Sequence, residues 1–241
     1  MEVLLNDNYY GINYLNLERN KNIIIDKLLL KIDESKRNSI LNQIENQVEL
    51  NINIRRADMH LISLYKVSFI KDYIYSEEEH ENTKEVLLEG NMLSNESVLG
   101  EPYNQCIIDI FYNWKNNIEI NWEKIKDVEV KNSYLKACYL WNGDSFEIRN
   151  ENDIYIDGEL ISCEEDVYYY LGQYIFGQRG FFGINLDSLE DFLIDIRKNN
   201  SVNMSVSFTH VDLIIEKTNK YFFETIVNLL EKATFKVKII H

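Results

Sequence analysis

The sequence predicts an α/β protein with two domains, a mainly β (α+β) domain over residues 1–150 and a three-stranded parallel sheet with about four helices over residues 151–241. Two observations predict this fold class. Strand-like and helix-like segments alternate along the second half, whereas the first half is dominated by β-branched and alternating segments. A chain of 241 residues suits one large domain or two small ones. The polar run Arg149–Asp153 marks the expected boundary.

The second half divides into segments with clear start and stop signals. A short apolar strand is broken by the Asp157-Gly158 turn, and Ser162 to Glu165 has the pattern of a capping box that opens a helix. Gly172 marks the last turn of that helix, and a glycine-punctuated loop follows. The later segments are a helix at 186–196, a strand at 202–208, helices at 209–218 and 219–233, and a strand at 235–240.

The resulting order is β-α-α-β-α-α-β. Strands that are joined through helices of this length run parallel, with right-handed crossovers. The pattern alone therefore predicts a three-stranded parallel sheet that is packed by helices.

The first half has strand-like content throughout, which predicts a mostly antiparallel domain with a short helix near Lys36 to Glu45. Asn142-Gly143-Asp144 is a turn signal that suits a hairpin. The segments interpreted as strand-like are Ile23–Ile32, Val48–Arg55, Leu61–Phe69, Glu85–Leu88, Gln105–Trp114 and Val128–Leu140.

The helix predicted at 186–196 has one apolar face and one acidic face. At about 100° per residue, Leu186, Leu189, Leu193 and Ile196 share one side, and Asp187, Glu190, Asp191 and Asp195 share the other. Like charges at i,i+4 destabilise a helix by roughly 0.2–0.5 kcal/mol each. The pattern favours use of this face against a cationic partner, although charged runs on surface helices are commonly only solvated.

Charge and composition argue against several classes of protein. The formal net charge of −15 argues against nucleic-acid binding and suits a basic partner. No apolar run approaches the roughly 20 residues of a membrane span, and the first residues lack the pattern of a signal peptide. Three cysteines, Cys106, Cys138 and Cys163, form no paired motif. They suit reduced thiols in a cytoplasmic protein.

Residues 181–191, Phe-Phe-Gly-Ile-Asn-Leu-Asp-Ser-Leu-Glu-Asp, resemble the signature of the barstar family of intracellular ribonuclease inhibitors. The resemblance covers about residues 151–241. By position, it implies that Asp187 and Asp191 bind the partner, with Asp191 as the central anchor. Gly183, Asn185 and Leu186 match the loop that sets these carboxylates in place. Phe181 matches an aromatic residue that lies against the enzyme, Glu190 stands where a tryptophan is typical, and Glu231 matches a further acidic contact.

The resemblance implies a non-enzymatic inhibitor, an antitoxin or immunity protein, which blocks the active site of a basic ribonuclease toxin with an acidic helix and needs no cofactor. Phe181 and Phe182 stand where tyrosines are typical. Together with Glu190, these departures argue against barnase itself and favour a related or convergent basic enzyme.

Two other functions stay open. The second half could be a barstar-fold interaction module that binds a protein other than a ribonuclease, or residues 1–150 could house an enzyme. The sequence offers little for catalysis, because its histidines (His60, His80, His210 and His241) are scattered and no phosphate-binding or nucleophile motif occurs. No catalytic, cofactor-binding or metal-binding residue is therefore assigned.

Overall fold

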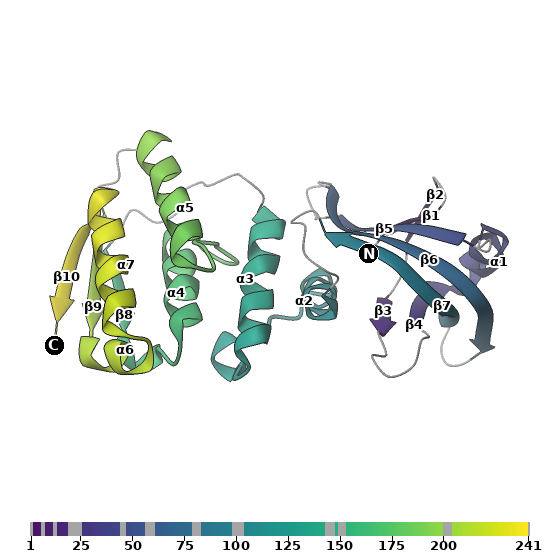
Figure 1. Cartoon of the computed structure of the whole chain (residues 1–241), viewed down its shortest axis with the longest axis horizontal. Helices are drawn as coiled ribbons and strands as arrows, with labels where there is room; N and C mark the ends of the chain where they lie inside the picture. Colours follow the sequence, from purple (N-terminus) through teal and green to yellow (C-terminus); the bar gives the residue numbers. More distant parts are fainter. Residues whose placement is uncertain are drawn as a thin grey trace. The chain divides into compact units, whose positions relative to one another are not determined.

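The computed structural model (Figure 1) describes residues 2–5, 8–11, 14–18, 26–43, 47–55, 61–78, 83–97, 104–142, 148, 153–199 and 204–240. The chain forms two compact units, Met1–Ile120 and Asn121–His241. Each unit is described separately below. Among the described residues, no helix combines the length and the apolar character that crossing a membrane requires.

The first unit is built on a seven-stranded antiparallel sheet in the order β2-β1-β5-β6-β7-β4-β3. The predicted mainly β, antiparallel character is confirmed, as is a short helix, α1, at Glu34–Gln43. The strands are β1 Glu2–Leu5, β2 Asn8–Gly11, β3 Tyr14–Glu18, β4 Asp26–Asp33, β5 Gln47–Arg55, β6 Leu61–Glu78 and β7 Thr83–Ser97.

Helix α2 (Gln105–Lys115) packs beside the edge strand β3. The Gln105 amide donates to the Leu15 carbonyl over 3.0 Å, and the Tyr14 hydroxyl donates to Asp109 over 2.8 Å. Burial and the Asp109 carboxylate together raise the pKa of Tyr14 to about 12. The Gln105 contact engages one backbone carbonyl of this edge strand, whose unpaired backbone groups could otherwise pair with another strand.

Two segments that the sequence pattern predicted as strands are helices. Gln105–Trp114 lies in α2, and Val128–Leu140 lies in α3 (Val128–Asn142). In α2 the buried residues Ile107, Phe111 and Trp114 are spaced three and four apart, which is the period of one helix face. The prediction was wrong because it weighed β-branched content above this spacing. Residues 143 and 144 of the predicted hairpin lie outside the described residues.

The second unit contains a three-stranded parallel sheet in the order β10-β9-β8, which confirms the prediction. Helix α4 packs beside β8 and α7 beside β10, while α5 packs against α7 (Figure 1). The elements are β8 Ile154–Asp157, a 3₁₀ turn at Gly158–Leu160, α4 Glu164–Phe176, α5 Leu186–Asn199, β9 Ser205–Thr209, α6 Val211–Lys217, α7 Lys220–Lys232 and β10 Lys236–Ile240.

The core of the second unit lies between these helices and the sheet. Leu171 of α4, Leu189 of α5, Ile226 of α7 and Phe208 of β9 are each fully buried. Helix α4 runs past Gly172 and ends at Phe176, with Gly177 as its C-cap, one turn later than the sequence pattern indicated. The apolar side chains Ile175 and Phe176 in that extra turn are also buried, which explains the extension.

The second compact unit begins at Asn121, whereas the sequence pattern placed the start of the second domain at residue 151. The difference arises because the 3₁₀ turn Trp122–Lys124 and helix α3 belong to the second unit, where α3 packs on α4. No linker-like composition announces this division, so it was not visible in the sequence.

Candidate partner-binding site

The loop between α4 and α5 crosses α4 at a contact between two glycines. A Cβ atom built on Gly172 or on Gly180 would overlap the carbonyl oxygen of the other residue. The loop turns at Gly177, where φ is +83°, and the Gly180 amide donates to the Gly177 carbonyl over 2.8 Å. The crossing therefore needs residues without side chains on both segments.

Gly183 makes the second sharp turn of this loop. Its φ of +109° lies in the region that only glycine adopts readily, and an added Cβ would lie 2.9 Å from the Leu189 amide nitrogen. The loop thereby closes onto the first turn of α5. The resemblance assigned Gly183 to the loop that orients the carboxylates, and the structure supplies this physical reason for a glycine there.

Asn185 caps the amino terminus of α5 together with Ser188. The Asn185 side-chain oxygen accepts from the Ser188 amide over 2.8 Å, and the Ser188 hydroxyl oxygen accepts from the Asn185 amide over 3.1 Å. The Ile184 amide also donates to that hydroxyl oxygen over 2.9 Å. Amides that would lack partners at the helix start are satisfied, so the direction of α5 is set at Asn185.

Replacing Asn185 with alanine is expected to lower the free energy of unfolding by about 1 kcal/mol, because the first turn of α5 loses its cap. Urea unfolding followed by circular dichroism measures the change. Asn228→Ala is the matched control, since Asn228 is exposed in the middle of α7. Equal stability of the two variants would show that the cap contributes nothing.

The acidic face of α5 points to solvent, and the apolar face points to the core. Asp187, Glu190 and Asp191 are exposed, whereas Leu189, Leu193 and Ile196 are at most 3% exposed. Leu186 is half-buried in the first turn. The exposed face also carries one large apolar side chain, Ile194, which is 43% exposed and follows Asp191 by three positions.

The carboxylates on this face differ in their partners. Asp195 forms an ion pair with Lys198 at 3.3 Å. Within the described part of the chain, no ion pair engages Asp187, Glu190 or Asp191. These three carboxylates, which we call the carboxylate row, are thus available to a cationic group from outside.

Phe181 and Glu231 occupy contrasting positions. Phe181 is only 6% exposed, because the rings of Tyr139 and Phe192 lie 5.1 and 5.2 Å from it, centroid to centroid. The resemblance places this aromatic residue against the partner, whereas this chain covers it with α3. Glu231 is exposed near the end of α7, the helix that packs against α5. Direct partner contacts by these residues stay predictions.

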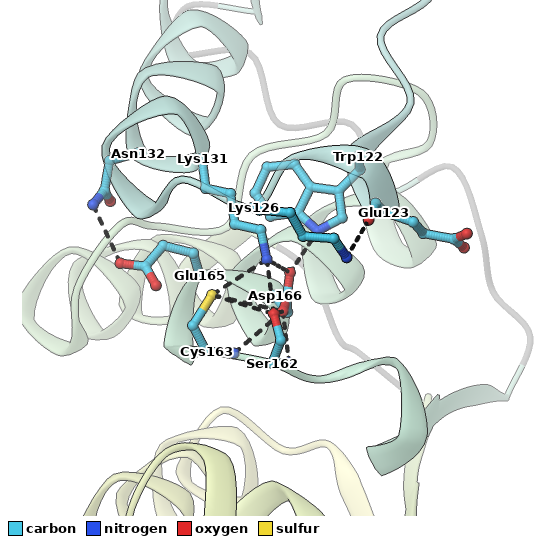
Figure 2. Close-up of polar contacts among 9 residues, drawn as sticks. All are labelled: Trp122, Glu123, Lys126, Lys131, Asn132, Ser162, Cys163, Glu165 and Asp166. Carbon is cyan, nitrogen blue, oxygen red and sulfur yellow. Dashed lines mark hydrogen bonds and ion pairs between the residues drawn. The ribbon is translucent and has the colours of Figure 1, made fainter.

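A buried polar cluster joins the segment 121–142 to α4 (Figure 2). We call it the Asp166 cluster. The Asp166 carboxylate accepts from Lys131 Nζ over 2.6 Å and from Trp122 Nε1 over 2.7 Å. The amide and the hydroxyl of Ser162 both donate to its second oxygen over 2.7 Å. The Lys131 and Asp166 side chains are 4% and 2% exposed, so the pair is shielded from water.

The protonation states of the Asp166 cluster suit a structural role. Burial favours the neutral form of each group, but the hydrogen bonds between them outweigh it, so the pKa of Lys131 is raised and that of Asp166 is lowered. Burial, with the Asp166 charge, raises the pKa of Cys163, whose sulfur lies 3.3 Å from Lys131 Nζ. A protonated lysine cannot serve Ser162 or Cys163 as a base.

Sequence reasoning missed this cluster. It placed the capping box at Ser162 and Glu165, whereas helix α4 begins after Cys163, and Asp166 reaches back to the Cys163 amide over 3.3 Å. The sequence did contain one sign of the cluster, the carboxylate of Asp166 three residues after Cys163, which is the spacing of a capping box. Nothing in the sequence marked Lys131 and Trp122 as partners of Asp166, because their segment was interpreted as part of the other domain. Among the described residues, no group of three potential metal ligands gathers.

Comparison with known families agrees with this architecture. Residues 152–238 match the family described as Barstar (barnase inhibitor), so this part of the chain belongs to the barstar family. That family consists of inhibitor domains rather than enzymes. The match begins after α3, so the segment that covers Phe181 lies outside the matched residues. Comparison with curated proteins gave no match.

Proposed function

We propose that the protein is an inhibitor of a basic ribonuclease, of the antitoxin or immunity type, and that it binds the enzyme through the carboxylate row of α5. The observation that carries this proposal is the exposure of Asp187, Glu190 and Asp191 on a helix whose start is held by a cap and by Gly183. The family match supports it, because its description names a ribonuclease inhibitor.

The physical basis is imitation of the RNA backbone by carboxylates. An enzyme that cleaves RNA binds phosphates through cationic side chains, and fixed carboxylates satisfy the same groups while excluding the substrate. A held helix presents its carboxylates without a large loss of conformational freedom on binding. The net charge of −15 also favours encounter with a basic partner.

A binding and inhibition assay with the whole chain tests the proposal. Barnase and a set of other cationic microbial ribonucleases are titrated with the chain, and residual RNA cleavage and the dissociation constant are measured. We expect stoichiometric inhibition of at least one of them. The whole chain is used because Asp166 in α4 depends on partners in residues 121–142. Binding without inhibition would favour the interaction-module alternative, and absence of binding would contradict the proposal.

Salt dependence provides a further expected result. Exposed charge attraction is screened beyond about 8 Å at physiological ionic strength. The association rate with the inhibited ribonuclease is therefore expected to fall as salt rises, while the dissociation rate changes less. Stopped-flow measurements at several salt concentrations separate the two rates. An association rate that is independent of salt would argue against the carboxylate row as the attracting surface.

A further inference from the structure

Helix α3 contacts the loop that leads into α5 through three residues of its last turn, Tyr139, Trp141 and Asn142. The Tyr139 ring lies on Phe181, with the centroids 5.1 Å apart. The Asn142 side-chain amide donates to the Arg179 carbonyl over 2.5 Å, and the Arg179 guanidinium lies 5.0 Å from the centroid of the Trp141 ring. These contacts hold both the backbone and the side chains of the loop.

The other end of α3 is fixed to the start of α4. Lys131 belongs to the first turns of α3 and ends in the Asp166 cluster, and the Trp122 ring stacks on Tyr169 of α4 at a centroid distance of 4.1 Å. Lys131 and Tyr139 are eight positions apart, which corresponds to about 12 Å along a helix. Helix α3 therefore connects the start of α4 to the loop that follows the end of α4.

We infer that α3 is a positioning element of the partner-binding site, acting through Tyr139 and Asn142 on the loop 177–183 and thereby on the start of α5. The expected effect of α3 on partner binding rests on the proposed function, whereas its effect on the shape of the loop does not. The turns of the loop use Gly177, Gly180 and Gly183, and glycine restricts the backbone least. The contacts from α3 therefore add to the glycine crossing and to the hydrogen bond between Gly180 and Gly177 in fixing the shape of the loop. Together with the Asn185 cap, this support sets where Asp187, in the first turn of α5, points.

The support also changes what a partner can touch. Phe181 is covered by the Tyr139 ring, and the Tyr139 side chain is itself half-buried, so part of that ring stays open to a partner where Phe181 does not. Helix α3 lies outside the residues that match the barstar family. The support that α3 gives is consequently additional to the residues that the family match covers, and it would contribute to the choice of ribonuclease.

The test compares Tyr139→Ala with Tyr139→Phe in the whole chain, and Tyr221→Ala, a 74% exposed tyrosine of α7, is the control. Amide hydrogen exchange is followed in peptides that cover residues 178–190 and in peptides that cover β8, β9 and β10. Removal of one aromatic pair is expected to speed exchange at 178–190 by about tenfold, with the strands unchanged. Tyr139→Phe keeps the ring and is expected to restore slow exchange.

The binding arm uses barnase and the cationic ribonucleases of the inhibition assay as probes. Tyr139→Ala is expected to weaken binding about tenfold, because the enzyme must then order a loosened loop, and Tyr139→Phe is expected to bind as the parent does. Unchanged exchange at 178–190, or equal acceleration in the strands, would overturn the inference. Failure of the parent chain to inhibit any ribonuclease would overturn the proposed function, while the exchange result would still decide the role of α3.

Discussion

Lys131→Met is expected to destabilise the second unit by about 3–5 kcal/mol, because it leaves the Asp166 carboxylate buried without its cation. Methionine has a similar volume and removes only the charge and its hydrogen bonds. Trp122 and Ser162 would still donate to Asp166, but neither supplies a positive charge. Urea unfolding followed by circular dichroism and tryptophan fluorescence measures the loss.

Lys126→Met is the matched control for this change. Lys126 is exposed, and its contact among the described residues is a hydrogen bond to the Glu123 carbonyl over 3.1 Å. Surface substitutions of this kind are usually within about 0.5 kcal/mol of the parent. If the two variants had similar stability, the Asp166 cluster could not be the contact that holds α3 to α4.

The contribution of the ion pair is expected to depend on pH in a defined direction. Asp166 has a lowered pKa in the folded chain, so its contribution is present above its unfolded pKa of about 3.9 and is lost as pH falls through the folded value. Lys131 has a raised pKa, so its contribution is present below about 10.4 and is lost as pH rises through the folded value.

The stability difference between the parent and Lys131→Met should therefore be largest between these limits and should shrink as pH falls through the lowered pKa of Asp166. Unfolding curves of both chains at pH 7 and at a series of acidic pH values follow this decrease. A difference that stays the same size throughout the series would show that packing of the lysine stem, rather than its charge, accounts for the loss.

Asp191→Ala is expected to weaken binding to the inhibited ribonuclease by about 3 kcal/mol, or roughly a hundredfold, since it leaves a cationic group of the enzyme buried without a partner. Asp191 is exposed on α5, and no ion pair within the described residues competes for it. Isothermal titration calorimetry with the parent and the variant measures the change in affinity.

Asp195→Ala is the matched control on the same helix. Asp195 already pairs with Lys198 at 3.3 Å, so a partner gains less from it. The effect is expected to stay below about 1 kcal/mol, which is the range of exposed ion pairs. Equal losses for both variants would contradict the geometry that the barstar resemblance assigns to α5.

The fold of the second unit could be predicted from the sequence because its signals were local. The strands β8, β9 and β10 alternate with helices, and some helix starts carry a recognisable cap, such as Asn219, whose side-chain oxygen accepts from the Phe222 amide over 2.8 Å. Parallel order then followed from connection length. The two faces of α5 followed from a period of 3.6 residues, and the structure places those side chains accordingly.

The extent of the second unit could not be predicted, because it depends on contacts between distant residues. Lys131 and Asp166 are separated by 35 positions, and each alone resembles an ordinary charged residue of a helix surface. Helices α2 and α3 were missed for a related reason. Isoleucine and valine favour strands by propensity, but the burial of one helix face overrides that preference.

The crossing of Gly172 and Gly180 is independent of the side chains on the exposed acidic face of α5. The contact is made by backbone atoms alone, so changes among the outward-facing carboxylates of α5 leave it untouched. Side chains on the outer face of α5 can therefore be exchanged while the crossing stays the same. We expect a pair of glycines eight positions apart to be retained in related chains whose exposed acidic residues on α5 differ.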